Sequence, residues 1–130
     1  MEGDRIVIEP HHQRAAQQID AHLAAHDLPG EERFVITVAG ESGSGKSETA
    51  AALAEALAAR GIDSVIFQQD DYFVYPPKSN DRARREDIGW VGPGEVRLEL
   101  LDGHLEAFRR GENALSKPLV RYAEDRVDEE

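Results

Sequence analysis

The stretch "VITVAGESGSGKSETAAAL", residues 35–53, decides how the rest of the sequence is interpreted. A run of apolar residues ends in a loop of glycine and serine, and an alanine-rich pattern typical of a helix follows. Gly40, Gly45, Lys46 and Ser47 satisfy the spacing G-x-x-x-x-G-K-[ST] without a gap. This pattern binds phosphates when a strand precedes it and a helix follows it. The stretch therefore predicts a phosphate-binding loop for a nucleoside triphosphate.

Each residue type in this loop has a physical reason for its place. Glycine lets the backbone adopt left-handed conformations and turn its N–H groups toward phosphate oxygens. The N-terminus of the following helix adds its dipole, Lys46 brings a positive charge to the β and γ phosphates, and Ser47 offers a hydroxyl to Mg²⁺. The expected ligands are ATP and Mg²⁺. The expected nucleotide-binding residues are Gly40, Glu41, Ser42, Gly43, Ser44, Gly45, Lys46, Ser47 and Glu48.

Two other nucleotide-binding patterns fail on this sequence. The dinucleotide fingerprint G-x-G-x-x-G is absent, because Glu48 stands where a third glycine would follow Gly43 and Gly45. The D-x-x-G of a GTPase occurs only at residues 27–30, before the loop, and no N-K-x-D appears.

The residues around the loop predict a βαβ unit. "RFVITVAG", residues 33–40, is nearly continuous in apolar and β-branched residues, as in a parallel strand buried on both faces. Residues 46–60 carry an apolar stripe that Gly61 ends, and "SVIFQQ", residues 64–69, predicts a second strand. A right-handed crossover would place both following loops at the ligand-binding edge. The predicted fold class is α/β, a three-layer P-loop NTPase fold with a mainly parallel sheet.

The chain is expected to form a single, incomplete domain over residues 1–130. An N-terminal extension occupies residues 1–30, the phosphate-binding unit residues 33–69, and an acceptor-side segment residues 70–130.

Both flanking segments carry further expected elements. Residues 5–8 predict a short edge strand, and Pro10 opens a polar helix. Residues 70–92 lack clear periodicity and predict a long surface excursion. A helix is expected to begin at Pro93 and to end at Gly111, and the charged tail is expected to contain no further strand.

The composition argues against several classes of function. The chain has a formal net charge of −11, which repels a nucleic-acid backbone, so no nucleic-acid partner is expected. It contains no cysteine, which excludes disulfides and thiolate metal sites. No stretch approaches the roughly 18 apolar residues of a membrane span, and the start lacks the pattern of a leader. These features are typical of a cytoplasmic protein without a membrane partner.

The end of the second predicted strand, "QQDDYF", carries the candidate catalytic carboxylate. An acidic residue at this edge reaches the γ-phosphate region, where it accepts a proton from an attacking hydroxyl or holds a Mg²⁺-bound water. Asp70 and Asp71 would point to opposite faces of the strand, so only one is expected to serve, and the residues alone leave open which. Lys46 is the second candidate catalytic residue.

The following side chains are candidates for acceptor binding. Tyr72, Phe73 and Tyr75 either line an acceptor pocket or pack the loop down. Arg84 and the neighbouring arginines either meet a phosphate or form a solvated charged run.

Two segments together resemble a known family. "GESGSGKSETAAALAEAL", residues 40–57, followed by "QQDDYF", residues 68–73, resembles the uridine kinase and phosphoribulokinase group of P-loop small-molecule kinases. In that group the strand after the loop ends in a Q-D-S-F-Y-like motif. The resemblance extends more weakly through residues 87–112 and 117–130. It implies transfer of the γ-phosphoryl group of ATP to a hydroxyl of a nucleoside, uridine or cytidine, or of a similar small metabolite.

The resemblance also assigns roles to individual residues. Asp70 would be the general base, and Asp87 lies near the position that holds ribose hydroxyls. Val120 and Asp125 stand where the group has a tyrosine and a histidine, so uridine itself is a doubtful acceptor. The substrate-side candidates are Asp71, Tyr72, Phe73, Arg84 and Asp87.

Members of the group continue with a Walker B-like strand and an arginine-bearing lid, before which this chain ends. The sequence is therefore expected to be a truncated kinase or a shortened relative, with weak or absent turnover on its own. The alternatives are a non-catalytic nucleotide-binding module that assembles into a homo-oligomer through exposed sheet edges, and a plain ATPase.

Overall fold

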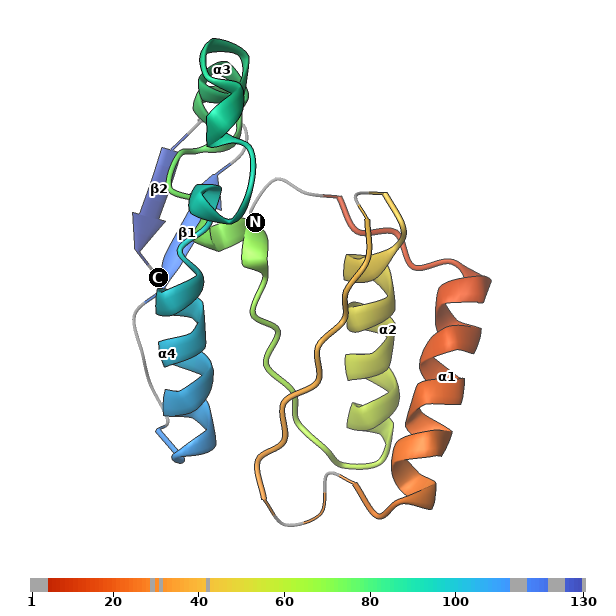
Figure 1. The fold of residues 1–130 in the computed structure, drawn as a ribbon. Coiled ribbons are helices and arrows are strands. Elements are labelled where there is room, and N and C mark those ends of the chain that lie inside the picture. The colour runs from red at the N-terminus through yellow and green to blue at the C-terminus, as the bar shows by residue number, and fades with distance from the viewer. Residues whose placement is uncertain are drawn as a thin grey trace. The chain divides into compact units, whose positions relative to one another are not determined.

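The computed structural model describes residues 5–28, 30, 32–41, 43–112, 117–121 and 126–129. Figure 1 shows the order of the helices and strands along the chain. The chain divides into two compact units, with residues 5–66 in the first and residues 67 onward in the second. Each unit is described by itself.

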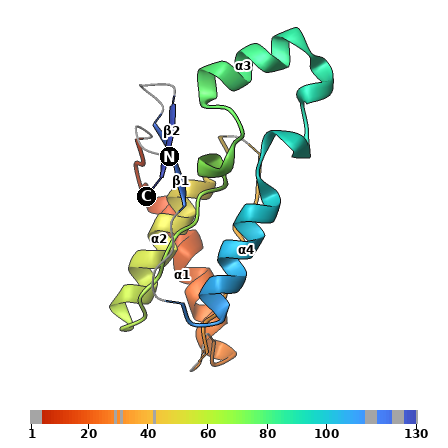
Figure 2. The same ribbon diagram turned by 90° about the vertical axis from the view of Figure 1, so that its left-hand side faces the viewer.

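Two parallel helices form the core of the first unit. Helix α1 spans Pro10–Ala25 and helix α2 spans Lys46–Ala59. Figures 1 and 2 show the two helices running in the same direction, so their N-termini lie at the same end. Their contact buries five side chains, and each buried leucine contributes about 1.5–3 kcal/mol. The buried residues are Ala16, Leu23, Ala52, Leu53 and Leu57.

Both predicted helices of the first unit are confirmed, and each ends in a left-handed residue. At the end of α1, Asp27 has φ 55° and Leu28 N–H donates to the Leu23 carbonyl at 2.9 Å. At the end of α2, Gly61 has φ 79° and Ile62 N–H donates to the Leu57 carbonyl at 3.0 Å. This six-to-one bond defines the Schellman motif, which closes the last turn of a helix.

The segments predicted as strands in the first unit are not assigned as strands. Residues 5–8, 33–40 and 64–68 carry no strand assignment, and Figure 1 draws the latter two as extended traces beside α2. Their apolar side chains are largely exposed, including Phe34 at 43% and Val65 at 68%. A strand needs ladder partners for its N–H and C=O groups, and apolar periodicity alone does not supply them. The three-layer fold therefore stays a prediction.

The second unit is built from short helices and one hairpin (Figure 2). Its 3₁₀ turns are Gln69–Tyr72, Ile88–Trp90 and Pro93–Glu95, and its α-helices are α3, Pro77–Glu86, and α4, Leu98–Arg109. Strands β1, Pro118–Arg121, and β2, Arg126–Glu129, pair antiparallel with Leu119 opposite Asp128.

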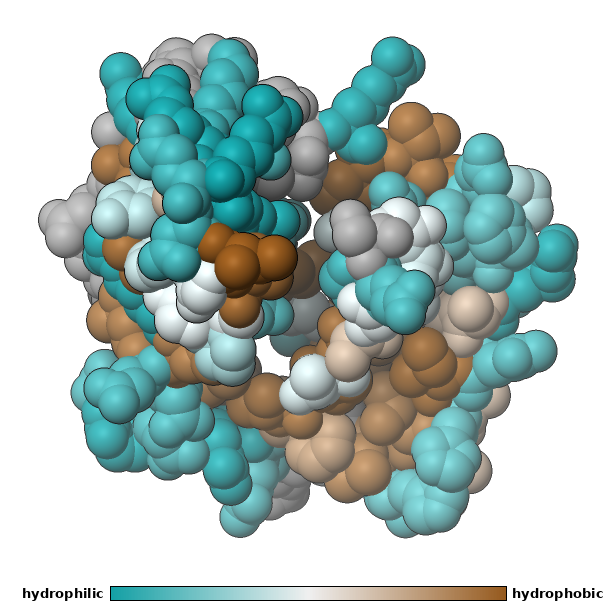
Figure 3. Space-filling view, turned by 45° about the horizontal axis from the view of Figure 1, so that its top comes forward, coloured by the Kyte–Doolittle hydropathy of each residue, from teal (hydrophilic) through white to brown (hydrophobic). Residues whose placement is uncertain are grey.

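Helix α3 corrects the expectation that residues 70–92 lack regular structure. Pro77 stands at its first position, where a missing N–H is tolerated. Its one buried side chain is Asn80, so the helix has no apolar stripe for a periodicity argument to detect. Figure 3 shows a largely hydrophilic surface where α3 comes forward.

Two further expectations about the second unit are wrong. The helix expected from Pro93 begins at Leu98, because Val96 forms a β-bridge with Phe73 and holds the chain extended. Arg97 N–H also donates to the Tyr72 carbonyl at 2.7 Å in this pairing. The tail expected to lack strands contains β1 and β2, whose pairing partners do not follow from composition.

None of the described helices is both long and apolar enough to cross a membrane.

Candidate functional site

The phosphate loop has the backbone geometry that its glycines predict. Gly43 and Gly45 have φ angles of 79° and 90°, in the left-handed region that side chains disfavour. A Cβ at Gly40 would lie only 2.5 Å from the Ser44 hydroxyl oxygen, so the loop closes on itself where that glycine sits. The chain then enters α2 with Gly45 as the N-cap.

The Glu41 carbonyl is the internal anchor of the loop. It accepts a hydrogen bond from Ser44 N–H at 3.1 Å and another from Lys46 Nζ at 3.1 Å. The lysine ammonium is therefore folded back over the loop whose phosphates it is expected to meet. Ser47 and Glu48 follow in the first turn of α2, where the N–H groups lack partners within the helix. Ser42 lies outside the described residues.

The loop residues fit a nucleoside triphosphate with Mg²⁺. Left-handed glycines, a helix N-terminus and a lysine are the donor set that holds phosphate oxygens. Magnesium in such sites is held mainly by phosphates, water and one or two protein oxygens, and Ser47 supplies such an oxygen. No group of three His, Asp or Glu residues within the described ranges forms a metal site of its own.

The two candidate aspartates have different environments in the second unit. Asp71 is 3% exposed, and Lys117 Nζ donates to its Oδ2 at 3.2 Å. The same ammonium donates to the Pro118 carbonyl at 3.3 Å, so this contact ties the 3₁₀ turn Gln69–Tyr72 to β1. Asp70 is only partly buried. The residue that the structure leaves more accessible is therefore Asp70.

The side chain of Tyr72 packs in the interior and holds the turn Gln69–Tyr72 in place. Its side chain is completely buried, and its hydroxyl lies 2.8 Å from His104 Nδ1 on α4. Burial, assisted by the negative charge of Asp71, raises the pKa of Tyr72 to about 12. The hydroxyl therefore stays protonated and shares a hydrogen bond with the imidazole. Of the two roles left open for Tyr72, the structure shows packing of the loop.

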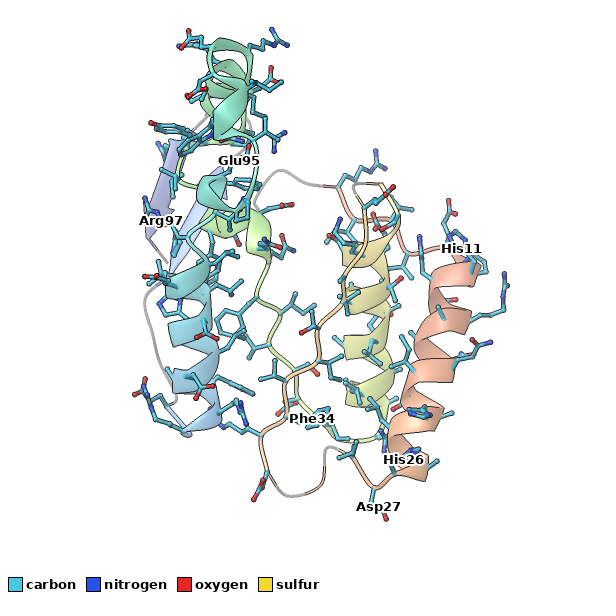
Figure 4. All side chains as sticks on the ribbon, viewed as in Figure 1. His11, His26, Asp27, Phe34, Glu95 and Arg97 are labelled. Carbon is cyan, nitrogen blue, oxygen red and sulfur yellow. The ribbon has the colours of Figure 1, made fainter. Side chains whose placement is uncertain are left out.

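A buried carboxylate organises the segment between α3 and α4. Glu95, labelled in Figure 4, is 5% exposed and accepts hydrogen bonds from Arg84 Nε, Asn80 Nδ2 at 3.1 Å and Gly92 N–H at 3.0 Å. Trp90 Nε1 donates to Asn80 Oδ1 at 2.7 Å and extends the network. The bond from Arg84, followed by that from Gly92, lowers the pKa of Glu95 to about 2.

The other substrate-side candidates have structural contacts as well. The guanidinium of Arg84 is engaged by Glu95, and Phe73 forms the bridge with Val96. Asp87 caps the turn Ile88–Trp90, where its Oδ1 accepts from Gly89 N–H at 2.9 Å. Sequence reasoning missed Lys117 and Glu95, because the partner of Lys117 lies 46 residues away and the two side-chain partners of Glu95, Arg84 and Asn80, lie 11 and 15 residues away.

The structure thus assembles the loop residues within the first unit and the aspartate, tyrosine and arginine candidates within the second. The family model described as Zeta toxin matches residues 20–91, which is 72 of the 130 residues. The match includes the phosphate loop, α2, both candidate aspartates and α3. No curated protein and no solved structure matches the chain.

Proposed function

Because this chain belongs to the Zeta toxin family, a family of P-loop kinase-like proteins, we propose that it transfers the γ-phosphoryl group of ATP to a hydroxyl. The acceptor class that we propose is a nucleoside, tested first with uridine and cytidine, or a similar small metabolite. The observation that carries the proposal is the left-handed glycine loop closed by Lys46 at the start of α2.

The loop would supply binding and charge stabilisation. Phosphoryl transfer involves little covalent chemistry on the protein side, so positioning and electrostatics dominate catalysis. Lys46 would leave the Glu41 carbonyl and contact the β and γ phosphates. Ser47 would give its hydroxyl oxygen to Mg²⁺, which offsets phosphate charge when it is bound.

Asp70 would act as the general base. It would accept the proton of the acceptor hydroxyl while the hydroxyl oxygen bonds to the γ-phosphorus and ADP departs. The pairing of Asp71 with Lys117 supports this choice, because a buried carboxylate held by an ammonium would have to break that bond to meet a hydroxyl. A water bound to Mg²⁺ is a second partner open to Asp70.

The first experiment measures Mg-ATP binding to the full chain by calorimetry. We expect Lys46→Ala to weaken binding on the order of 100-fold, because a charge-assisted contact to phosphate is lost. The circular dichroism spectrum and thermal midpoint should be unchanged, since the hydrogen bond from Lys46 to the Glu41 carbonyl is exposed.

Lys78→Ala serves as the matched control, because it removes a lysine from α3 in the other unit. A folded Lys46→Ala variant that binds Mg-ATP with wild-type affinity would contradict the proposal.

Exposed apolar side chains in the first unit favour a second candidate, a nucleotide-binding module that self-associates. Phe34, Ile36, Val65 and Ile66 are each exposed by 39% or more. Exposed apolar clusters of this kind promote association. Light scattering with and without ATP separates the two functions: a stable oligomer with nucleotide binding and no transfer to any acceptor indicates the module.

A further inference from the structure

A histidine outside the phosphate-loop motif lies against the loop. His12 belongs to the first turn of α1, and its ring approaches Gly45, the last loop residue before Lys46. A Cβ at Gly45 would lie 3.1 Å from His12 Nε2 and 3.4 Å from its Cδ2. Both residues belong to the first unit. The imidazole thus borders the loop directly.

Helix packing fixes this approach. His12, Ala16, Ile19 and Leu23 recur at three or four residues and share one face of α1. Ala16 and Leu23 are buried against α2, and Ile19 packs on the same core. The two helices run in parallel, so the face that packs on α2 brings its N-terminal residue beside the start of α2 (Figures 1 and 2).

A second contact, at the opposite end of the helix pair, also fixes how α1 and α2 lie along each other. Arg60, the C-cap of α2, pairs with Asp20 of α1, with 2.6 Å between Nη2 and Oδ1. Because both ends of the pair are anchored, His12 cannot slide away from Gly45 without disturbing the core.

A backbone hydrogen bond decides which ring nitrogen carries the proton. Glu9 N–H donates to His12 Nδ1 at 3.0 Å, as part of the capping box of α1. In the neutral imidazole the nitrogen that accepts lacks a proton, so Nε2 carries the N–H. Within the described part of the chain, Nε2 has no hydrogen-bond acceptor. An N–H donor of fixed tautomer therefore stands beside the loop.

We infer that His12 is a further phosphate-binding residue, whose Nε2–H donates to an oxygen of the polyphosphate held by the loop. This inference rests on the proposed function, since it requires a nucleotide in the loop. The N-terminal turn of α1 adds its partial positive charge at the same end as that of α2. The neighbouring His11 contacts His12 through its ring, with 4.0 Å between the ring centroids, while its own Nδ1 lies 3.4 Å from the exposed Glu9 carboxylate.

The test compares three variants of the full chain for Mg-ATP and Mg-ADP affinity by calorimetry. His12→Asn keeps an acceptor near Glu9 N–H but cannot place a donor where Nε2 lies. His12→Gln restores a donor at a similar reach and is a residue that capping boxes use at this position. His22→Asn is the matched control, because it removes an imidazole from the last turn of the same helix.

We expect His12→Asn to lower the affinity for both nucleotides about tenfold or more, because a hydrogen bond to a charged group is lost. The affinity of His12→Gln should stay within about threefold of wild type, and His22→Asn should bind as wild type does. The thermal midpoint of His12→Asn should fall by no more than about 3 °C if the cap is retained.

A spectroscopic measurement on the wild type covers the case in which His12→Asn fails to fold. The ¹⁵N shift of His12 Nε2 should change when Mg-ATP is added and should not change with adenosine.

Wild-type affinity in folded His12→Asn, or an unchanged Nε2 shift on saturation with Mg-ATP, would overturn the inference while leaving the proposed function intact. Failure of the wild type to bind ATP, or binding that is independent of Lys46, would overturn both.

Discussion

At the scale of single residues, two helices with similar C-terminal ends differ in the residue that occupies the left-handed backbone position. Helices α1 and α2 both close with a Schellman motif, yet α1 uses Asp27 where α2 uses Gly61. A residue with a Cβ is strained in this conformation by about 1 kcal/mol relative to glycine. At the C-terminal cap of α1, the sequence therefore has a residue that is less stable in this conformation than glycine.

We expect Asp27→Gly to raise the free energy of unfolding by roughly 0.5–1 kcal/mol, since it removes this strain. Gly61→Ala should lower it by about 1 kcal/mol, although no atom lies within 4 Å of the added methyl group, because the strain comes from φ alone. Urea denaturation followed by circular dichroism measures both. Equal stabilities for the wild type and both variants would show that these caps do not limit stability.

At the scale of elements, the polar network of Glu95 replaces an apolar core for α3. The carboxylate joins Asn80 and Arg84 of α3 to the turn at Gly92, and Trp90 binds the same asparagine. Buried polar groups stabilise a structure only when their hydrogen bonds are complete. Helix α3 should therefore depend on the protonation of one carboxylate.

The sign of this dependence follows from the pKa of Glu95, which the fold lowers from 4.5 to about 2. The ionised carboxylate stabilises the folded state above pH 4.5, and this contribution is lost as the pH falls toward 2. We expect Glu95→Gln to lower stability at pH 7 and to flatten the acid dependence between pH 4.5 and 2.

Thermal melts across this pH range, with Glu106→Gln as the control, test the expectation. Glu106 pairs with Arg109 on an exposed part of α4, where ion pairs contribute little. An acid profile of Glu95→Gln that matches the wild type would exclude the carboxylate as the source.

At the scale of the whole molecule, the residues proposed for nucleotide binding and for proton transfer belong to different units. The phosphate loop belongs to the first and the aspartates to the second. A mutation should therefore be able to affect phosphoryl transfer without affecting nucleotide binding, because the two depend on residues of different units.

We expect Asp70→Asn to bind Mg-ATP within about threefold of wild type and to lose transfer by a factor on the order of 100 to 10,000, the usual effect of a general base. Asp71→Asn should instead destabilise the second unit by about 3 kcal/mol, because Lys117 loses its buried partner. ADP formation with uridine or cytidine as acceptor, together with thermal melts, measures the two effects. Active Asp70→Asn beside a folded and inactive Asp71→Asn would assign the base to Asp71.

Local chemistry explains what could be predicted from the sequence. The loop at residues 40–47, the two helices beside it and the stop at Gly61 each depend on residues within a few positions of one another. The same holds for the broad class, since the loop motif and the residues after the next apolar run predict P-loop kinase-like chemistry and the Zeta toxin match agrees with it, whereas the resemblance to the uridine kinase and phosphoribulokinase group is not confirmed. The identity of the acceptor could not be predicted in this way, because no local motif identifies the residues that bind it.

By itself, the sequence determined the phosphate loop and the helices around it, because spacing and glycine placement act locally. Only the tertiary structure decided that Val96 pairs with Phe73 and delays α4, that Lys117 holds Asp71, and that His12 meets Gly45. These contacts join residues far apart along the chain. They form because packing and hydrogen bonding bring those residues together, which no periodicity within a single segment records.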